Sequence, residues 1–121
     1  MHRRLPGMAA YNLLHFTAQC PCCGVVATME FQLHAATSFG SDVNGRFANR
    51  TYVFGQRLQW WDRADPRFST WVDHSYVRAS ENNEVVENAA GRCTNCKAIV
   101  SCNILYREMR VEGINLLKCG D

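Results

Sequence analysis

The chain has 121 residues, a formal net charge of +2 and a hydrophobic fraction of 47%. This length suits one domain with a modest core, and the composition is that of an ordinary globular protein. No stretch approaches the roughly 18 continuous apolar residues of a membrane span, and the small net charge argues against a strong phosphate-binding role.

The first expected element is a strand over residues 11–18, an apolar run that leads directly into a cysteine-rich turn. Cys20 and Cys23 form a C-x-x-C pair in this turn. Pro21 presets the bend, and Gly24 can take the positive φ that the chain often needs on leaving such a turn. A turn of this kind aims two sulfur atoms at one point.

Residues 25–34 alternate between apolar and polar side chains, which predicts a half-buried strand. Residues 35–50 are small, polar and glycine-containing, so a long loop is expected there. Residues 51–54 and 57–61 are aromatic and β-branched on either side of a glycine turn, which predicts a β-hairpin or a sharply bent strand pair. Residues 68–79 suit one or two further short strands.

The second C-x-x-C pair, Cys93 and Cys96, lies far along the chain from the first. Residues 85–90, just before it, suit either a strand or one helical turn. Strands over residues 98–106 and 109–117 are expected to form a C-terminal hairpin. The insertion between the two cysteine pairs therefore lies between two hairpins.

Two C-x-x-C turns that face each other supply the four thiolates of a structural zinc site. We expect one structural Zn²⁺ bound by Cys20, Cys23, Cys93 and Cys96. Two alternatives stay open, because such pairs can also be disulfide-bonded or redox-active, and C-P-x-C-G turns suit iron as well. An enzyme is not expected, because four cysteine ligands leave no open coordination position.

Three cysteines remain, Cys22, Cys102 and Cys119, and they are expected to be free. The turn that places its first and fourth residues on the ion points Cys22 elsewhere, although replacement of Cys20 or Cys23 by Cys22 stays open. Free thiols fit a reducing compartment, and the N-terminus lacks the apolar segment of a secretory leader. A cytoplasmic location is therefore expected.

The expected fold is mostly β: a zinc-ribbon-like domain with two C-x-x-C turns and an inserted antiparallel sheet. Residues 1–10 are expected to form a flexible N-terminal arm, and residues 11–121 a single domain with the insertion at about residues 35–80. Stability is expected to depend on the metal, because the crosslink closes a long loop in a small domain.

The chain resembles small bacterial zinc-ribbon-like proteins, through the pattern Cys20-Pro21-x-Cys23-Gly24, Phe39-Gly40, Tyr52-x-x-Gly55-x-x-Leu58-x-Trp60 and Cys93-x-x-Cys96. Gln56 stands where that pattern has Asp. Some members are candidate immunity proteins of polymorphic toxins. The resemblance therefore implies a protein that neutralises a toxin by direct binding.

The residues themselves also favour a non-catalytic protein-binding module. Aromatic side chains and arginines are concentrated in the insertion, and these side chains commonly anchor protein interfaces. We expect partner contacts from Arg46, Arg50, Trp60 and Trp61. The alternative is a nucleic-acid-binding protein, because arginines with aromatic rings can clamp phosphates and stack bases; the acidic residues among these arginines argue against it.

Overall fold

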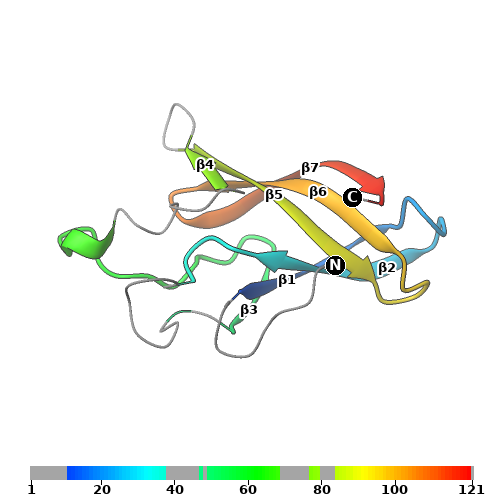
Figure 1. Ribbon diagram of the computed structural model, residues 1–121, viewed down its shortest axis with the longest axis horizontal. Helices are drawn as coiled ribbons and strands as arrows, with labels where there is room; N and C mark the ends of the chain where they lie inside the picture. The colour runs from blue at the N-terminus through cyan, green and yellow to red at the C-terminus, as the bar shows by residue number, and fades with distance from the viewer. Residues whose placement is uncertain (1–10, 38–46, 48, 69–76, 80–83, 121) are drawn as a thin grey trace.

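The structure is a computed structural model that describes residues 11–37, 47, 49–68, 77–79 and 84–120. Seven strands in this part form one sheet: β1 (Asn12–Gln19), β2 (Val26–Leu33), β3 (Thr51–Val53), β4 (Val77–Ala79), β5 (Glu84–Cys93), β6 (Ile99–Arg107) and β7 (Arg110–Cys119). Their order is β3-β1-β2-β5-β6-β7, with β4 paired to β5 (Figure 1). The expected mostly β fold with two facing C-x-x-C turns is confirmed.

β1 and β2 form an antiparallel hairpin, and its turn carries the first cysteine pair. The hairpin is in register from Asn12 opposite Leu33 to Gln19 opposite Val26. Met29 and Phe31 of β2, like Leu33, are fully buried. The period-two alternation predicted for this strand is confirmed from Thr28 to Phe31, whereas Gln32, predicted to be on the polar face, is buried as well.

β5 resolves the ambiguous segment before the second cysteine pair, because it is a strand that runs directly into Cys93. β6 pairs with β5 on one side and with β7 on the other, both antiparallel. The β6–β7 turn is made by Glu108 and Met109, both with positive φ (49° and 63°), as expected of a two-residue hairpin loop that matches the twist of its strands. The C-terminal hairpin is confirmed, and its second strand reaches Cys119.

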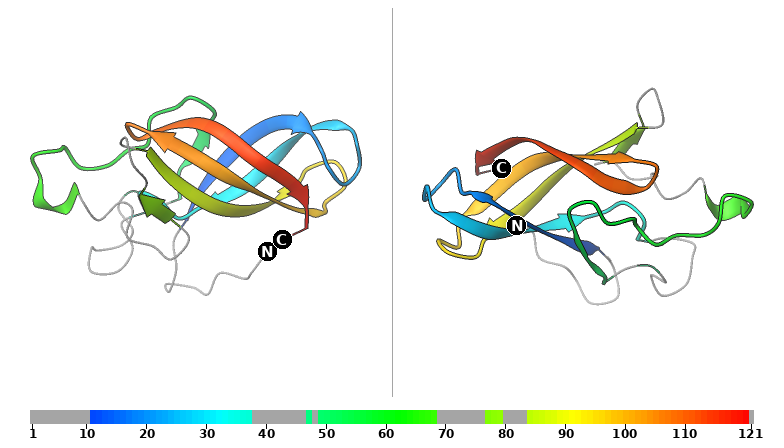
Figure 2. Two further views of the ribbon diagram at one scale, coloured as in Figure 1. Left: turned by 90° about the horizontal axis from the view of Figure 1, so that it is seen from above. Right: turned by 180° about the vertical axis from the view of Figure 1, so that it is seen from behind.

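The sheet is curled (Figure 2), and the inserted segment pairs with it through two short strands, β3 and β4. β3 pairs in parallel with β1. After the turn at Gly55 the chain crosses to the start of β7, where the Leu58 amide donates to the Met109 carbonyl (2.6 Å). The pairing expected between residues 51–54 and 57–61 is thus replaced by separate pairings with β1 and β7. Burial explains this choice, because it places Tyr52 and Leu58 in the core.

The buried apolar side chains of the described residues form one hydrophobic core. Every long strand and the inserted segment contribute to it, and the largest buried side chains include Leu14, Met29, Phe31, Leu33, Tyr52, Leu58, Ile104 and Tyr106. In the described part of the chain, no helix has the length and apolar character needed to cross a membrane. The expected N-terminal arm, residues 1–10, lies outside the described residues.

Candidate metal centre

The two C-x-x-C turns have the same backbone hydrogen bond. In the first turn the Gly24 amide donates to the Cys20 carbonyl (2.8 Å), and in the second the Lys97 amide donates to the Cys93 carbonyl (2.9 Å). The residue after each pair has positive φ, 76° at Gly24 and 66° at Lys97. The conformation predicted for Gly24 is therefore confirmed, and Lys97 adopts it with a side chain present.

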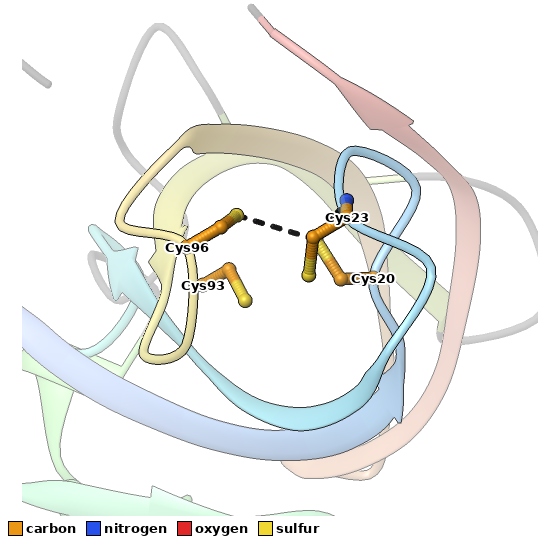
Figure 3. Close-up of side chains that lie close together, drawn as sticks. All are labelled: Cys20, Cys23, Cys93 and Cys96. Carbon is orange, nitrogen blue, oxygen red and sulfur yellow. Dashed lines mark hydrogen bonds between the residues drawn. The ribbon is translucent and has the colours of Figure 1, made fainter.

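The curled sheet brings the four cysteines of these turns together. Cys20 and Cys23 come from the β1–β2 turn, Cys93 and Cys96 come from the β5–β6 turn, and the two pairs face each other (Figure 3). Their sulfur atoms all lie within 4.8 Å of one another, and the Cys20 and Cys96 sulfurs are 3.9 Å apart. A tetrahedral zinc with Zn–S bonds of about 2.3 Å has sulfur–sulfur edges of about 3.8 Å. The cluster can hold a metal ion with little rearrangement.

Amide groups of the turns point at the sulfur atoms. The amides of Cys22 and Cys23 lie 3.3 and 3.5 Å from the Cys20 sulfur, and the Asn95 side-chain amide lies 3.6 Å from the Cys23 sulfur. N–H groups stabilise a thiolate over a thiol. The turns are therefore built to hold the form of cysteine that binds metal.

The pKa values of two ligands reflect these contacts. The Val25 amide and then the Asn95 side chain lower the pKa of Cys23 to about 6. The pKa of Cys93 is also lowered, with the Cys96 amide as the largest cause. Both cysteines are therefore predisposed to bind as thiolates.

The pKa of Cys96 shifts in the opposite direction, because its sulfur lies close to those of the other three cysteines. The Ala98 amide favours its thiolate, but burial and the hydrogen bonds to the other cysteines raise the pKa of Cys96 to about 11. A fourth thiolate thus forms readily only when a cation compensates the accumulated negative charge. The donor set fits a metal dication.

Contacts between β2 and the second turn keep the two cysteine pairs in position. The Thr94 amide and hydroxyl both donate to the Thr28 carbonyl, at 3.0 and 2.7 Å. The Lys97 ammonium donates to the Thr94 carbonyl (2.8 Å). Met29 lies opposite Cys93 in the β2–β5 ladder, so strand pairing itself sets the distance between the two turns.

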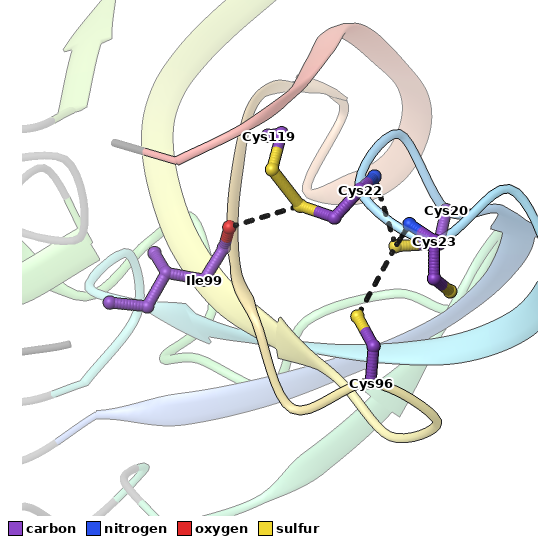
Figure 4. Close-up of a disulfide and its surroundings, with 6 residues drawn as sticks. All are labelled: Cys20, Cys22, Cys23, Cys96, Ile99 and Cys119. Carbon is purple, nitrogen blue, oxygen red and sulfur yellow. Dashed lines mark hydrogen bonds between the residues drawn. A yellow bond between two sulfur atoms is a disulfide. The ribbon is translucent and has the colours of Figure 1, made fainter.

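The expectation that Cys22 and Cys119 are free is wrong, because they form a disulfide (Figure 4). Cys22 points out of the first turn, as expected from its position between the two ligands, and meets Cys119 at the end of β7. The β6–β7 register places Cys119 opposite Val100, close after the second turn, and so brings the end of β7 to the cysteine cluster. Cys102 is free and buried, so the free-thiol argument for a reducing compartment now rests on Cys102 alone.

Three of the four residues expected to contact a partner belong to one group of side chains on the inserted segment. Arg46 falls outside the described residues. The others belong to what we call the Arg–aromatic cluster: Phe47, Arg50, Trp60, Trp61, Arg63, Arg67 and Phe68.

The rings of the Arg–aromatic cluster pack against one another. Phe47 lies 5.2 Å from Trp60 and 5.0 Å from Trp61 between ring centroids, and the two tryptophans are 4.7 Å apart. The Trp60 indole donates to the Phe68 carbonyl (2.9 Å). Trp61 is only 8% exposed, so it supports the cluster from beneath and Trp60 is the more accessible indole.

Glu87 is an internal acid that the sequence analysis did not single out. Its side chain is fully buried on β5. It accepts hydrogen bonds from the amides of His34 and Ala35 and from the Tyr106 hydroxyl (2.8 Å). Glu87 lies an even number of residues before Cys93 on β5, so the two side chains share one face of the strand. This spacing is the sequence signal that could have predicted its burial.

Comparison with known proteins adds no identification: no protein-family model, curated protein or solved structure matches the chain. The resemblance to zinc-ribbon-like proteins therefore stays a prediction that rests on the sequence pattern.

Proposed function

We propose that the chain is a non-catalytic, zinc-stabilised domain that binds another protein. The observation that carries the metal part is the four-cysteine cluster, in which two identical turns direct four sulfurs to one point. Four thiolates fill a tetrahedral coordination sphere, so the metal stabilises the fold and has no position for a substrate. Zinc is preferred to iron because it suits a structural site without redox chemistry.

The Arg–aromatic cluster is the proposed partner surface. The guanidinium carbon of Arg67 lies 4.5 Å above the Trp61 ring, and that of Arg63 lies 5.5 Å above the Phe68 ring. A guanidinium held on a ring has less conformational freedom to lose on binding than a free one. Arginine and tryptophan in such settings commonly dominate binding energy.

The charge of this surface indicates the chemistry of the partner. Its three arginines, Arg50, Arg63 and Arg67, outnumber the acidic residues of the same segment, Asp62 and Asp65. The surface therefore suits an acidic protein. Arg67 makes two hydrogen bonds to the Asp65 carboxylate, at 2.9 and 2.7 Å. The acidic residues among the arginines leave this surface without the strong basic excess expected of a nucleic-acid-binding face. A toxin neutralised by direct binding is the specific partner that the sequence resemblance implies.

The test measures binding and protection against a toxin encoded beside the gene. The double variant Arg63→Glu/Arg67→Glu is expected to lose about 30-fold or more in affinity, because hot-spot arginines are worth about 2 kcal/mol or more. Lys118→Glu is the matched control, since Lys118 is exposed on β7 outside the cluster. Equal loss in both variants would contradict this surface, and salt-sensitive retention on single-stranded DNA would support a nucleic-acid partner instead.

A further inference from the structure

The disulfide lies directly beside the proposed metal centre. Cys22 is the residue between Pro21 and Cys23 in the first turn, and its amide points at the Cys20 sulfur (3.3 Å). The backbone that carries one half of the disulfide therefore also carries an N–H group that stabilises a metal ligand (Figure 4). Cys22 therefore belongs both to the disulfide and to the hydrogen bonds around the cluster.

The same disulfide ties two parts of the sheet together around the cluster. On one side it holds the β1–β2 turn, and on the other it holds the end of β7, which pairs with the start of β6. β6 begins at Ile99, immediately after the second cysteine turn. The Cys22–Cys119 bond thus ties the first turn to the strand pair that begins directly after the second turn.

The two halves of the disulfide differ in exposure. Cys119 is exposed at the end of β7, whereas Cys22 is only partly exposed, and its sulfur lies 3.7 Å from the Ile99 carbonyl oxygen. A small thiol therefore reaches the Cys119 sulfur more easily. Attack there makes Cys22 the leaving thiolate, next to the metal ligands.

We propose that Cys22–Cys119 is a thiol–disulfide exchange site that controls how tightly the neighbouring cluster retains its metal. The co-reactant is a dithiol. One of its thiolates attacks the Cys119 sulfur, forming a mixed disulfide and releasing Cys22 as a thiolate. Its second thiolate then closes an internal disulfide and releases Cys119, so two electrons pass from the dithiol to the protein.

Reduction has two consequences for the metal centre. It frees the end of β7 from the first turn, and it places a fifth sulfur nucleophile between two ligands of the same turn. Cys22 can then displace Cys20 or Cys23 from the ion and open a route to ligand exchange. This inference rests on the metal centre proposed above.

The experiment follows zinc transfer from the full-length, zinc-loaded protein to a chromogenic chelator. The oxidised protein is compared with protein reduced by a dithiol that is removed before measurement, and iodoacetamide labelling counts the free thiols in each. We expect reduction to speed zinc release at least about tenfold, the size of effect seen when groups supporting a metal site are removed.

Variants separate the effect of losing the disulfide bond from the effect of gaining a free Cys22 thiol. Cys119→Ser keeps a free Cys22 and is expected to release zinc as fast as the reduced protein. Cys22→Ser lacks the bond but also lacks the competing sulfur, so its release is expected to be slower than that of Cys119→Ser. Cys102→Ser removes a buried free thiol and is expected to match the oxidised protein.

Three results would overturn the inference. Equal rates of zinc release from oxidised and reduced protein would contradict this inference but not the metal centre. Labelling of both Cys22 and Cys119 in air-oxidised protein would do the same. A folded chain that binds no zinc would instead contradict the metal centre and, with it, this inference.

Discussion

At the scale of single residues, the buried Glu87 side chain satisfies backbone amides that lie beyond the end of a neighbouring strand. β2 and β5 are in register only from Met29 opposite Cys93 to Phe31 opposite Gly91. Continuing that register would place Ala35 opposite Glu87. At this position β5 pairs with β4 instead, with Val77 opposite Glu87. The Glu87 carboxylate accepts hydrogen bonds from the amides of His34 and Ala35, which lie beyond the end of β2.

Glu87→Gln is therefore expected to destabilise the fold. Both carboxylate oxygens of Glu87 accept hydrogen bonds, and the glutamine side chain would replace one of them with an NH₂ group that faces other donors. A buried polar group left without a partner costs about 1–3 kcal/mol. Urea denaturation measures the free energy of unfolding. Glu84→Gln on the same strand is the control, since Glu84 is partly exposed and pairs with Arg107 at the surface, where such pairs are worth about 0–1 kcal/mol. An equal cost for both changes would refute the role assigned to Glu87.

Cys102 provides a prediction about pH. Burial and then the charge of Glu87 raise the pKa of Cys102 from 9.0 to about 12. Between these values the unfolded chain loses the thiol proton and the folded chain keeps it, so the unfolded state binds fewer protons and stability falls as pH rises. The contribution is fully present below pH 9 and lost towards pH 12.

Cys102→Ala removes this contribution. From pH 8 to pH 10.5 the wild-type protein is expected to lose about 2 kcal/mol more of its free energy of unfolding than Cys102→Ala does, from the proton linkage of one group. The packing cost of the substitution is the same at both pH values and cancels in this comparison. Parallel pH dependences of urea denaturation in the two proteins would show that Cys102 titrates normally when folded.

At the scale of elements, the antiparallel pairing of β2 with β5 is the contact that positions the cluster. A Cβ atom on Gly91 would lie 2.1 Å from the Glu30 carbonyl oxygen and 2.8 Å from the Phe31 Cα. Both neighbours are backbone atoms, so they cannot move aside without separating the strands. Cys93 lies only two residues further along β5, so this close approach and the metal ligand are mechanically linked.

Gly91→Ala is expected to destabilise the fold by about 3 kcal/mol or more, because the new methyl group forces the paired backbones of β2 and β5 apart. Its zinc content is also expected to fall. Gly113→Ala is the matched control: its Cβ would lie 3.6 Å from the Leu105 Cβ, an ordinary contact, and its cost is expected to stay near 0.5 kcal/mol. Denaturation midpoints and elemental analysis compare the two, and a stable, zinc-replete Gly91→Ala protein would disprove the link.

The sequence predicted what is local and missed what depends on pairing between distant segments. The cysteine turns, the β2 alternation and the C-terminal hairpin follow from spacing and period within a few residues. The pairing partners of β3 and of the segment around Leu58 depend on which strand edges remain unpaired in the curled sheet. The periodicity of the sequence carries no information about those edges. The Cys22–Cys119 pair was missed for the same reason, since it joins residues 97 positions apart.

At the scale of the whole molecule, two crosslinks close nearly the same long stretch of chain. The proposed metal joins Cys23 to Cys93, and the disulfide joins Cys22 to Cys119 with a separation of 97 residues. A crosslink that closes a loop of this size removes on the order of 4 kcal/mol from the unfolded state. That is comparable with the whole stability of a small domain, so the metal is expected to be a condition of folding.

The most direct test of the metal centre counts zinc per chain and records the circular dichroism spectrum in three proteins. The wild type and Cys102→Ser are expected to be folded with one zinc each. Cys93→Ser is expected to lose the metal and the β-sheet spectrum together, because structural zinc binding and folding are one equilibrium. A folded wild type that lacks metal or holds iron, or a folded Cys93→Ser protein that retains zinc, would contradict the account.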